Sequence, residues 1–233
     1  MPINKLQIKS TSLAESREMT VFLPSSHSPA SNCPIVFCTD GQALAMFAHG
    51  FESRIRDCEL PEIVLVGVHS SQHRAQEYTL GYNDLKYRTH EQFFTEEVPE
   101  WLKSEFGLVT DRSRTGVFGF SHGGAFVLTM AARHRDLYGL VIAFSIAGGF
   151  EQFQITEQSH ELSPRFYLSA GTREKPLLKT TRRLAKHLNR HKIDCVVTER
   201  PAGHDYEYWR TELPIALKWG FAASNSHNIC DIS

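Results

Sequence analysis

The chain has 233 residues, of which 41% are hydrophobic and 22% are charged, as in an ordinary globular protein. Its 25 Lys and Arg nearly balance 26 Asp and Glu, which argues against nucleic acid or an anionic membrane as the main partner. No apolar run could span a bilayer, the N-terminus lacks the apolar core of a signal peptide, and the 5 cysteines form no zinc or redox motif. We therefore expect a cytoplasmic protein with reduced thiols.

The predicted strands fall into two groups. Apolar and polar residues alternate within Leu6–Leu23, which predicts two strands joined near Ala14–Arg17. Continuous apolar runs further along are typical of strands buried on both faces of a parallel sheet. These runs are IVFCTDG at 35–41, EIVLVGVH at 62–69, RTGVFGF at 114–120, GLVIAFSIAGG at 139–149, RFYLSAG at 165–171 and DCVVTERPAG at 194–203.

Helical patterns separate these runs. A helical stretch covers Ala43 to about Cys58, and a polar loop, Ser70–Tyr87, leads to a helix at about Glu91–Phe106 whose apolar side chains share one face. The remaining predicted helices are Ala125–Arg133, Leu177–Arg190 and Tyr206–Phe221.

The alternation of strands and helices predicts an α/β protein with a mostly parallel, doubly wound sheet and an antiparallel N-terminal edge. We expect a single domain at 1–222 and a loose polar tail at 223–233. The connection GGFEQFQITEQSHELSPR at 148–165 is too short for a lid domain. The cleft should therefore be open, which disfavours long-chain lipids as substrates.

The stretch GFSHGG at 119–124 fits the pattern G-x-S-x-G between a buried strand and a helix, which is the setting of a nucleophile elbow. Such a turn raises Ser121 above the sheet edge. The strand and the helix pass so close to each other that the positions two before and two after the serine must be small, and these positions are Gly119 and Gly123. His122 is adjacent to the serine, but neighbouring side chains diverge at an elbow. We predict that His122 contributes its backbone N–H and is not the base.

An α/β-hydrolase carries its triad in the order Ser, acid, His. Glu174 lies in the glycine turn after the strand at 165–171, and His204 precedes the last helix. Both residues follow the carboxyl end of a parallel strand, where open α/β sheets place their sites. The predicted triad is therefore Ser121, Glu174 and His204.

Other carboxylates are candidates for the acid. Glu157 and Glu161 lie one strand earlier, where some hydrolases carry it, and both remain alternatives. Asp205 is adjacent to His204, Asp194 begins a strand at the wrong edge, and Glu199 lies within a strand, so these three are disfavoured.

Acyl transfer develops negative charge on the carbonyl oxygen, which needs two converging N–H donors. The backbone N–H of His122 is one, and Gly41 or Gln42 in the CTDGQ loop is the expected second.

Substrate contacts are expected from Asp40 and from the polar loop, through His69, Arg74 and Tyr78. The alternative is that Arg74 and Glu77 only pair with each other to brace the loop. No histidine pair has a carboxylate at metal-binding spacing, so we expect no metal and no cofactor.

Several of these segments together resemble the family called "putative esterase", a branch of the α/β-hydrolases with enterochelin (siderophore) esterases, feruloyl esterases and esterase D relatives. The segments are VFCTDGQ, IVLVGVHSSQHRAQEYT, GVFGFSHGG, YLSAGTREKP and GHDYEYWRTELP, which span nearly all of 35–220. The resemblance implies the same triad, Ser121, Glu174 and His204.

The sequence thus predicts a serine carboxylesterase that hydrolyses small or polar acyl esters through an acyl-enzyme, with a small-molecule ester as its partner. A siderophore ester hydrolase is one alternative. An acyltransferase or a non-catalytic binding member of the fold is an alternative from another class, and a homo-oligomer is left open.

Overall fold

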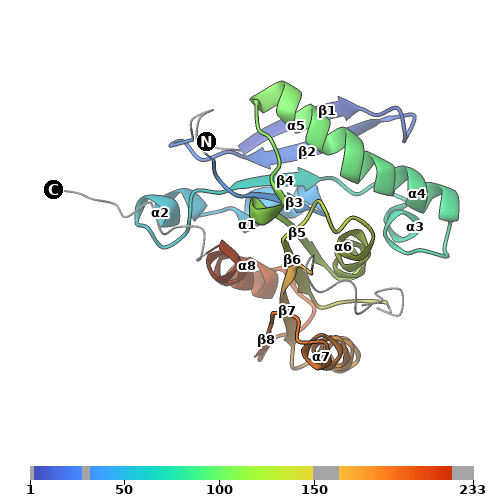
Figure 1. The fold of residues 1–233 in the computed structure, drawn as a ribbon, viewed down its shortest axis with the longest axis vertical. Helices are drawn as coiled ribbons and strands as arrows, with labels where there is room; N and C mark the ends of the chain where they lie inside the picture. The colour runs from blue at the N-terminus through green and yellow to red at the C-terminus, as the bar shows by residue number, and fades with distance from the viewer. Residues whose placement is uncertain (1–2, 28–31, 149–162, 222–233) are drawn as a thin grey trace.

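The computed structural model describes residues 3–27, 32–148 and 163–221, which build one eight-stranded sheet (Figure 1). The first two strand pairings, β1 with β2 and β2 with β4, are antiparallel, and all the others are parallel. This confirms the predicted α/β-hydrolase class with its antiparallel N-terminal edge. In sheet order the strands are β1 (Ile3–Lys9), β2 (Ser16–Phe22), β4 (Val64–Val68), β3 (Ile35–Cys38), β5 (Thr115–Phe120), β6 (Leu140–Phe144), β7 (Arg165–Gly171) and β8 (Cys195–Arg200).

Helices cover both faces of the sheet (Figure 1). One face carries α3 (Arg74–Tyr78), α4 (Asp84–Gln92), α5 (Val98–Phe106), α6 (His122–Arg133) and α7 (Lys175–Arg190). The other face carries α1 (Leu44–Phe47), α2 (Phe51–Arg56) and α8 (Tyr206–Phe221). None of the described helices is both long and apolar enough to cross a membrane.

Two apolar cores result, one on each face of the sheet. Side chains alternate between the faces of a strand, so Val117 of β5 enters the core under α6 while Phe118 and Phe120 enter the core under α8. Every residue of β5 is buried. β5, the central strand that leads to the GFSHGG motif at 119–124, is therefore packed on both faces.

The observed elements differ from the predicted ones in two places. The predicted helix from Ala43 to Cys58 is divided into α1 and α2, which follow a 3-10 turn at Gly41–Ala43 and are separated at Gly50 by a left-handed backbone (φ 82°). The predicted polar loop Ser70–Tyr87 contains α3 and the start of α4, which begins after Asn83 because the Asn83 side chain accepts the backbone N–H of Lys86. A five-residue π-helical turn (93–97) then joins α4 to α5.

Some predictions fall on residues outside the described ranges. These include the alternative acids Glu157 and Glu161, most of the connection predicted to be too short for a lid, and the predicted tail at 223–233.

Candidate active site

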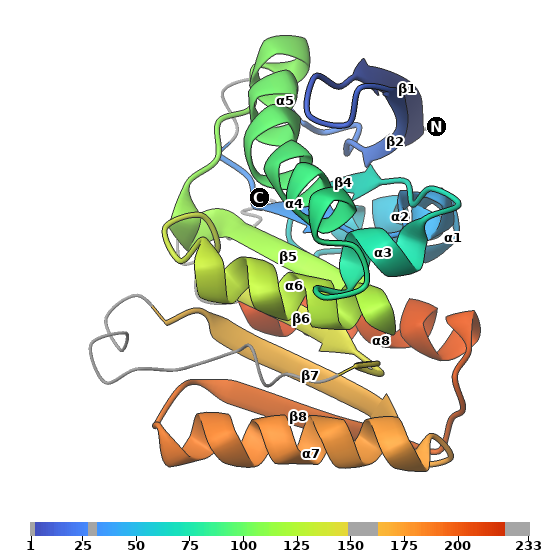
Figure 2. The same ribbon diagram turned by 90° about the vertical axis from the view of Figure 1, so that its right-hand side faces the viewer.

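The predicted triad and the predicted oxyanion loop lie at the carboxyl edge of the parallel strands. The CTDGQ loop follows β3, the elbow follows β5, the Glu174 turn follows β7, and the His204 turn follows β8. This edge lies on the right in Figure 2, where β5 ends and the chain enters α7 and α8. Segments far apart in the sequence therefore meet at one place because the strands run in the same direction.

Ser121 occupies a strained turn between β5 and α6. Its backbone angles are φ 56° and ψ −128°, outside the regions that side-chain-bearing residues prefer. A Cβ added at Gly119 would lie 2.3 Å from the carbonyl oxygen of Gly123, and one at Gly123 would lie 2.3 Å from Thr39 Oγ1. The close passage of strand and helix therefore requires both glycines, and the turn has the geometry of a nucleophile elbow.

Glu174 and His204 form a hydrogen-bonded pair. Oε1 of the buried Glu174 lies 2.5 Å from His204 Nδ1. Its other oxygen, Oε2, accepts hydrogen bonds from Ser145 Oγ and from the Gly171 backbone N–H, each at 2.8 Å. The carboxylate is held at both oxygens, and with Nδ1 engaged, Nε2 is the nitrogen of His204 that remains for proton exchange.

Aromatic contacts place His204 beside the elbow. The ring of Trp209 lies 4.8 Å from the His204 ring and 4.2 Å from that of Phe120, the residue before Ser121. Burial lowers the pKa of His122, the nearby Arg74 charge lowers it further, and the Asp40 carboxylate partly offsets both. The Glu174–His204 pair and the elbow thus lie close to each other.

The three disfavoured carboxylates have partners of their own. Asp194 forms an ion pair with Arg165 at 2.7 Å, and Glu199 forms one with Arg182 at 2.6 Å. Asp205 accepts a backbone N–H in the first turn of α8 at 2.9 Å. The observed hydrogen bonds therefore give these groups local structural roles.

The CTDGQ loop packs tightly against β4. A Cβ at Gly41 would lie 2.3 Å from the carbonyl group of Gly67, so this position also requires glycine. The Gln42 side chain is bound to Ser70, donating from Nε2 to Oγ at 2.7 Å and accepting the Ser70 N–H at 3.1 Å. The loop that carries the predicted second oxyanion donor is thus fixed to the neighbouring strand.

Three of the predicted substrate-binding residues bind each other. Arg74 donates Nε to Asp40 Oδ1 at 2.5 Å and a terminal nitrogen to Oδ2 at 2.7 Å, and its guanidinium lies 5.0 Å from the centre of the Tyr78 ring. The Asp40 backbone N–H donates to the Tyr78 hydroxyl at 3.1 Å. Burial lowers the pKa of Arg74, but the hydrogen bonds to Asp40 outweigh it and leave that pKa raised. Asp40 and Tyr78 are buried, so Arg74, with 27% of its side chain exposed, is the member of this group that faces solvent.

The alternative pairing of Arg74 with Glu77 is wrong. Glu77 instead accepts a hydrogen bond from Arg17 of β2 at 2.8 Å and one from Ser71 Oγ at 2.7 Å. Arg17 is buried, and Glu77 is the buried carboxylate that balances its charge. No local pattern in the sequence indicates this long-range pair.

The fourth predicted substrate contact, His69, is turned towards β2. Its Nε2 lies 2.8 Å from Thr20 Oγ1, and its Nδ1 lies 3.2 Å from Glu18 Oε2. Burial lowers the pKa of His69, and the Glu18 carboxylate partly offsets this. Both ring nitrogens are therefore engaged within the protein.

Two site residues were missed in the sequence, Ser145 and Trp209. Ser145 is fully buried directly after β6, where it donates to Glu174 and accepts from Trp209 Nε1 at 2.9 Å. Its position at the carboxyl end of a parallel strand was the available signal. The only sequence signal for Trp209 is its place in the segment GHDYEYWRTELP, which resembles the family.

Within the described ranges, no group of three His, Cys, Asp or Glu side chains is arranged to hold a metal ion. The His187 and His191 rings pack on each other at the end of α7, with centroids 4.8 Å apart.

Comparison with known proteins identifies one family and many solved structures with a similar fold. A model of the family described as "Putative esterase" matches residues 10–219. No curated protein matches the sequence. Among solved structures, a ferulic acid esterase has a TM-score of 0.79 at 21% identity, with 93% of this chain and 96% of that one covered.

Two further structures are similar. The enterobactin esterase from Shigella flexneri, solved with 2,3-dihydroxy-N-benzoyl-serine, has a TM-score of 0.78 at 23% identity, covering 96% of this chain but 60% of its own. A ferulic acid esterase from Anaeromyces mucronatus, solved with ferulic acid, has a TM-score of 0.75 at 18% identity, covering 96% and 92%. At these identities the structures establish a shared fold.

Proposed function

Because the chain belongs to the Putative esterase family, we propose that it is a serine carboxylesterase that uses Ser121, His204 and Glu174 as its triad. The observation that carries this proposal is the hydrogen bond from His204 Nδ1 to the fully engaged carboxylate of Glu174, next to a serine in an elbow turn. In this arrangement an acid orients a base, and the base has one nitrogen left for the nucleophile.

The reaction would proceed in two halves. Ser121 Oγ attacks the ester carbonyl while His204 Nε2 takes its proton, and the tetrahedral intermediate collapses as His204 returns that proton to the leaving alcohol. Water then gives a proton to His204 and attacks the acyl-enzyme, and the acid leaves as Ser121 regains its proton. Glu174 stabilises the imidazolium in both halves. The N–H groups of His122 and of Gly41 or Gln42 would bind the oxyanion.

The proposed substrates are small or polar acyl esters. Arg74 and the Gln42–Ser70 pair are polar groups at the proposed oxyanion loop; Gln42 is exposed, and Arg74 and Ser70 are partly exposed. A polar ester would meet these groups without leaving its own polar atoms unpaired.

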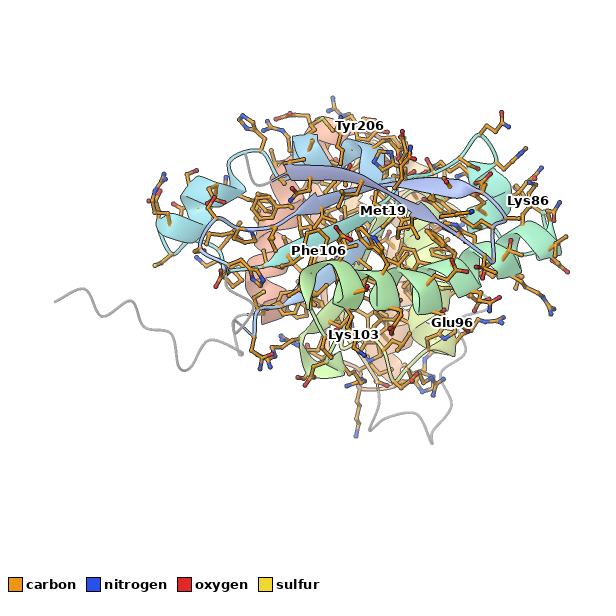
Figure 3. The ribbon with its side chains drawn as sticks, turned by 90° about the horizontal axis from the view of Figure 1, so that it is seen from above. Met19, Lys86, Glu96, Lys103, Phe106 and Tyr206 are labelled. Atoms are coloured by element: carbon orange, nitrogen blue, oxygen red, sulfur yellow. The ribbon has the colours of Figure 1, made fainter. Side chains whose placement is uncertain are left out.

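Esters with an aromatic acyl group, including catecholate siderophores, are the second candidate. Tyr206 lies two residues after His204, is 47% exposed and contacts the rings of Phe47, Phe120 and Trp209. Figure 3 shows it at the periphery, on the opposite side of the molecule from Lys103. An aromatic group could stack there, and similar structures include enzymes solved with ferulic acid and with a dihydroxybenzoyl compound.

The test is hydrolysis of p-nitrophenyl acetate by wild type and by Ser121→Ala. We expect a loss in kcat of roughly 10⁴- to 10⁶-fold, as for other serine nucleophiles. Ser104→Ala, on the exposed face of α5, is the matched control and should behave as wild type. Hydrolysis by Ser121→Ala near the wild-type rate would refute the proposal.

A substrate panel separates the candidates. Short acyl esters, feruloyl esters, S-acyl glutathione and a catecholate siderophore are compared by kcat/KM, first in wild type and then in Tyr206→Ala. A selective loss of feruloyl hydrolysis in Tyr206→Ala would favour the aromatic candidate. Product analysis with a competing alcohol would reveal an acyltransferase.

A further inference from the structure

Trp209 contacts His204 of the proposed triad directly, and it also contacts Phe120, which precedes Ser121, and Ser145, which is hydrogen-bonded to Glu174. It is a buried residue of α8, only 3% exposed. Its ring meets that of His204 edge to face at an interplanar angle of 89°, and it stacks on Phe120 at 21°. Its indole N–H donates to Ser145 Oγ, which in turn donates to Glu174.

The direction of this hydrogen-bond chain is fixed by chemistry. An indole nitrogen can only donate, so Ser145 Oγ must accept from Trp209. The single hydroxyl proton of Ser145 is therefore free to be donated to Glu174 Oε2, and an ionised carboxylate can only accept. Trp209 thus selects the orientation in which Ser145 supports the carboxylate form of Glu174.

The backbone of Ser145 indicates that this position is specialised. Its φ is 47°, in the left-handed region that a non-glycine residue rarely adopts, and its side chain is fully buried. Its N–H donates to the Ser169 carbonyl at 2.8 Å, which anchors the turn to β7. The strained turn aims the hydroxyl at the acid.

We propose that Trp209 and Ser145 are positioning residues, which hold the Glu174–His204 pair at the distance from Ser121 that proton transfer requires. This inference rests on the proposed triad. Without the Ser145 hydroxyl, the Gly171 N–H is the one donor to Oε2 of Glu174 that remains among the described residues. Without the indole, His204 also loses the ring that packs it against the elbow strand.

The test is steady-state kinetics of Ser145→Ala and Trp209→Phe on an ester that the wild type hydrolyses. Both side chains are buried, so they cannot contact substrate, and kcat should fall while KM stays near wild type. The expected loss is roughly ten- to hundredfold, the scale of a small misplacement of catalytic groups. Trp219→Phe is the matched control, because Trp219 lies on the same helix but packs on Tyr167 and Arg165.

Two further measurements distinguish positioning from a general loss of stability. Trp209→Phe should add little to Ser145→Ala, since both break the same chain to Glu174. The far-downfield proton resonance of the His204 Nδ1–H should be altered in both variants and retained in Trp219→Phe. His204→Gln, which lacks this proton, assigns the resonance.

Wild-type kcat in Ser145→Ala and Trp209→Phe, together with an inactive Ser121→Ala, would overturn this inference alone. An active Ser121→Ala would instead overturn the triad on which it rests. A loss confined to KM, or an equal loss in Trp219→Phe, would also contradict it. Ser145→Ala removes only a hydroxyl group, so it remains a usable test if Trp209→Phe does not fold.

Discussion

At the scale of single residues, the site depends on two serines with strained backbones and on glycines that allow close packing. Ser121 and Ser145 both adopt backbone angles that cost of order 1–3 kcal/mol, and each presents a hydroxyl at the carboxyl edge of the sheet. Glycines at 119 and 123 allow the first of these turns. The fold therefore tolerates local strain where the proposed chemistry takes place.

Glu174→Gln should lower kcat by about 10⁴-fold, as in other triads that lose the acid. The amide would keep the shape of the site but favour the wrong tautomer of His204. Steady-state kinetics on the best substrate measures this. A rate close to wild type would move the acid role to Glu157 or Glu161.

Gly119→Ala should destabilise the protein by about 3 kcal/mol, because its Cβ would meet the Gly123 carbonyl, a backbone group with little freedom to move. Urea unfolding measures this change. Gly203→Ala is the control, since a Cβ there meets only Asp205 Oδ2 at 3.6 Å. Equal stability of the two variants would contradict the close packing of strand and helix.

The proposed triad is assigned from the sequence residue by residue because each member follows its own strand in a known order. Ser145 and Trp209 could not, since their roles arise from contacts across 29 and 64 positions of sequence that no spacing encodes. A serine after a buried strand has no distinguishing local pattern. Only the packing of α8 against the sheet brings the indole to that hydroxyl.

At the scale of elements, the Asp40–Arg74 ion pair joins the loop after β3 to α3. Arg74 also reaches the elbow strand, where it lies 3.5 Å from the carbonyl oxygen of Phe120. The pair therefore connects the loop with the predicted second oxyanion donor to the strand that carries Ser121. The sequence did not predict α3, because the helix has only five residues and they are mostly polar.

Arg74→Met should lower the free energy of unfolding by about 2 kcal/mol. Removing one partner of a buried ion pair costs about 3–5 kcal/mol, and Arg74 is partly exposed, which reduces the effect. The exposed Arg54→Met is the control. The double variant Asp40→Asn, Arg74→Met should recover part of the loss, and a double variant less stable than the sum of both single changes would contradict this account.

At the scale of the whole molecule, stability should depend on pH through a buried histidine. His90 is fully buried among the rings of Tyr78, Phe93, Phe94 and Phe126, and neither of its ring nitrogens has a hydrogen-bond partner in the part of the chain that the structure describes. Burial lowers its pKa from 6.5 to about 4, although the Glu77 carboxylate favours the charged form. The folded state therefore binds this proton more weakly than the unfolded chain does.

The contribution of neutral His90 to the free energy of unfolding is complete above pH 6.5. It is lost as the pH falls towards 4, because over this range the unfolded chain is protonated at this histidine while the folded protein is not. The total effect is about 3 kcal/mol, at 1.36 kcal/mol per pKa unit. His90→Phe should flatten the pH dependence of unfolding over this range, while the exposed His49→Phe should not. An unchanged slope in His90→Phe would contradict the prediction.

Of the three scales, the whole molecule was the most predictable from the sequence, because its order of strands and helices could be read from the pattern of apolar runs. Continuous apolar runs marked the parallel strands, since a strand buried on both faces needs apolar residues throughout. The broken helix after β3 and the helices within the loop at 70–87 were not predicted, because short polar helices lack a periodic apolar face.

The central claim is that Ser121 is the nucleophile and that His204, not the adjacent His122, is its base. Mass spectrometry after treatment with a fluorophosphonate tests it most directly. We predict a single adduct on Ser121, formed at a normal rate in His122→Ala, which keeps the backbone N–H, and lost in His204→Ala. An adduct on another residue, or labelling that survives in His204→Ala but fails in His122→Ala, would contradict the account.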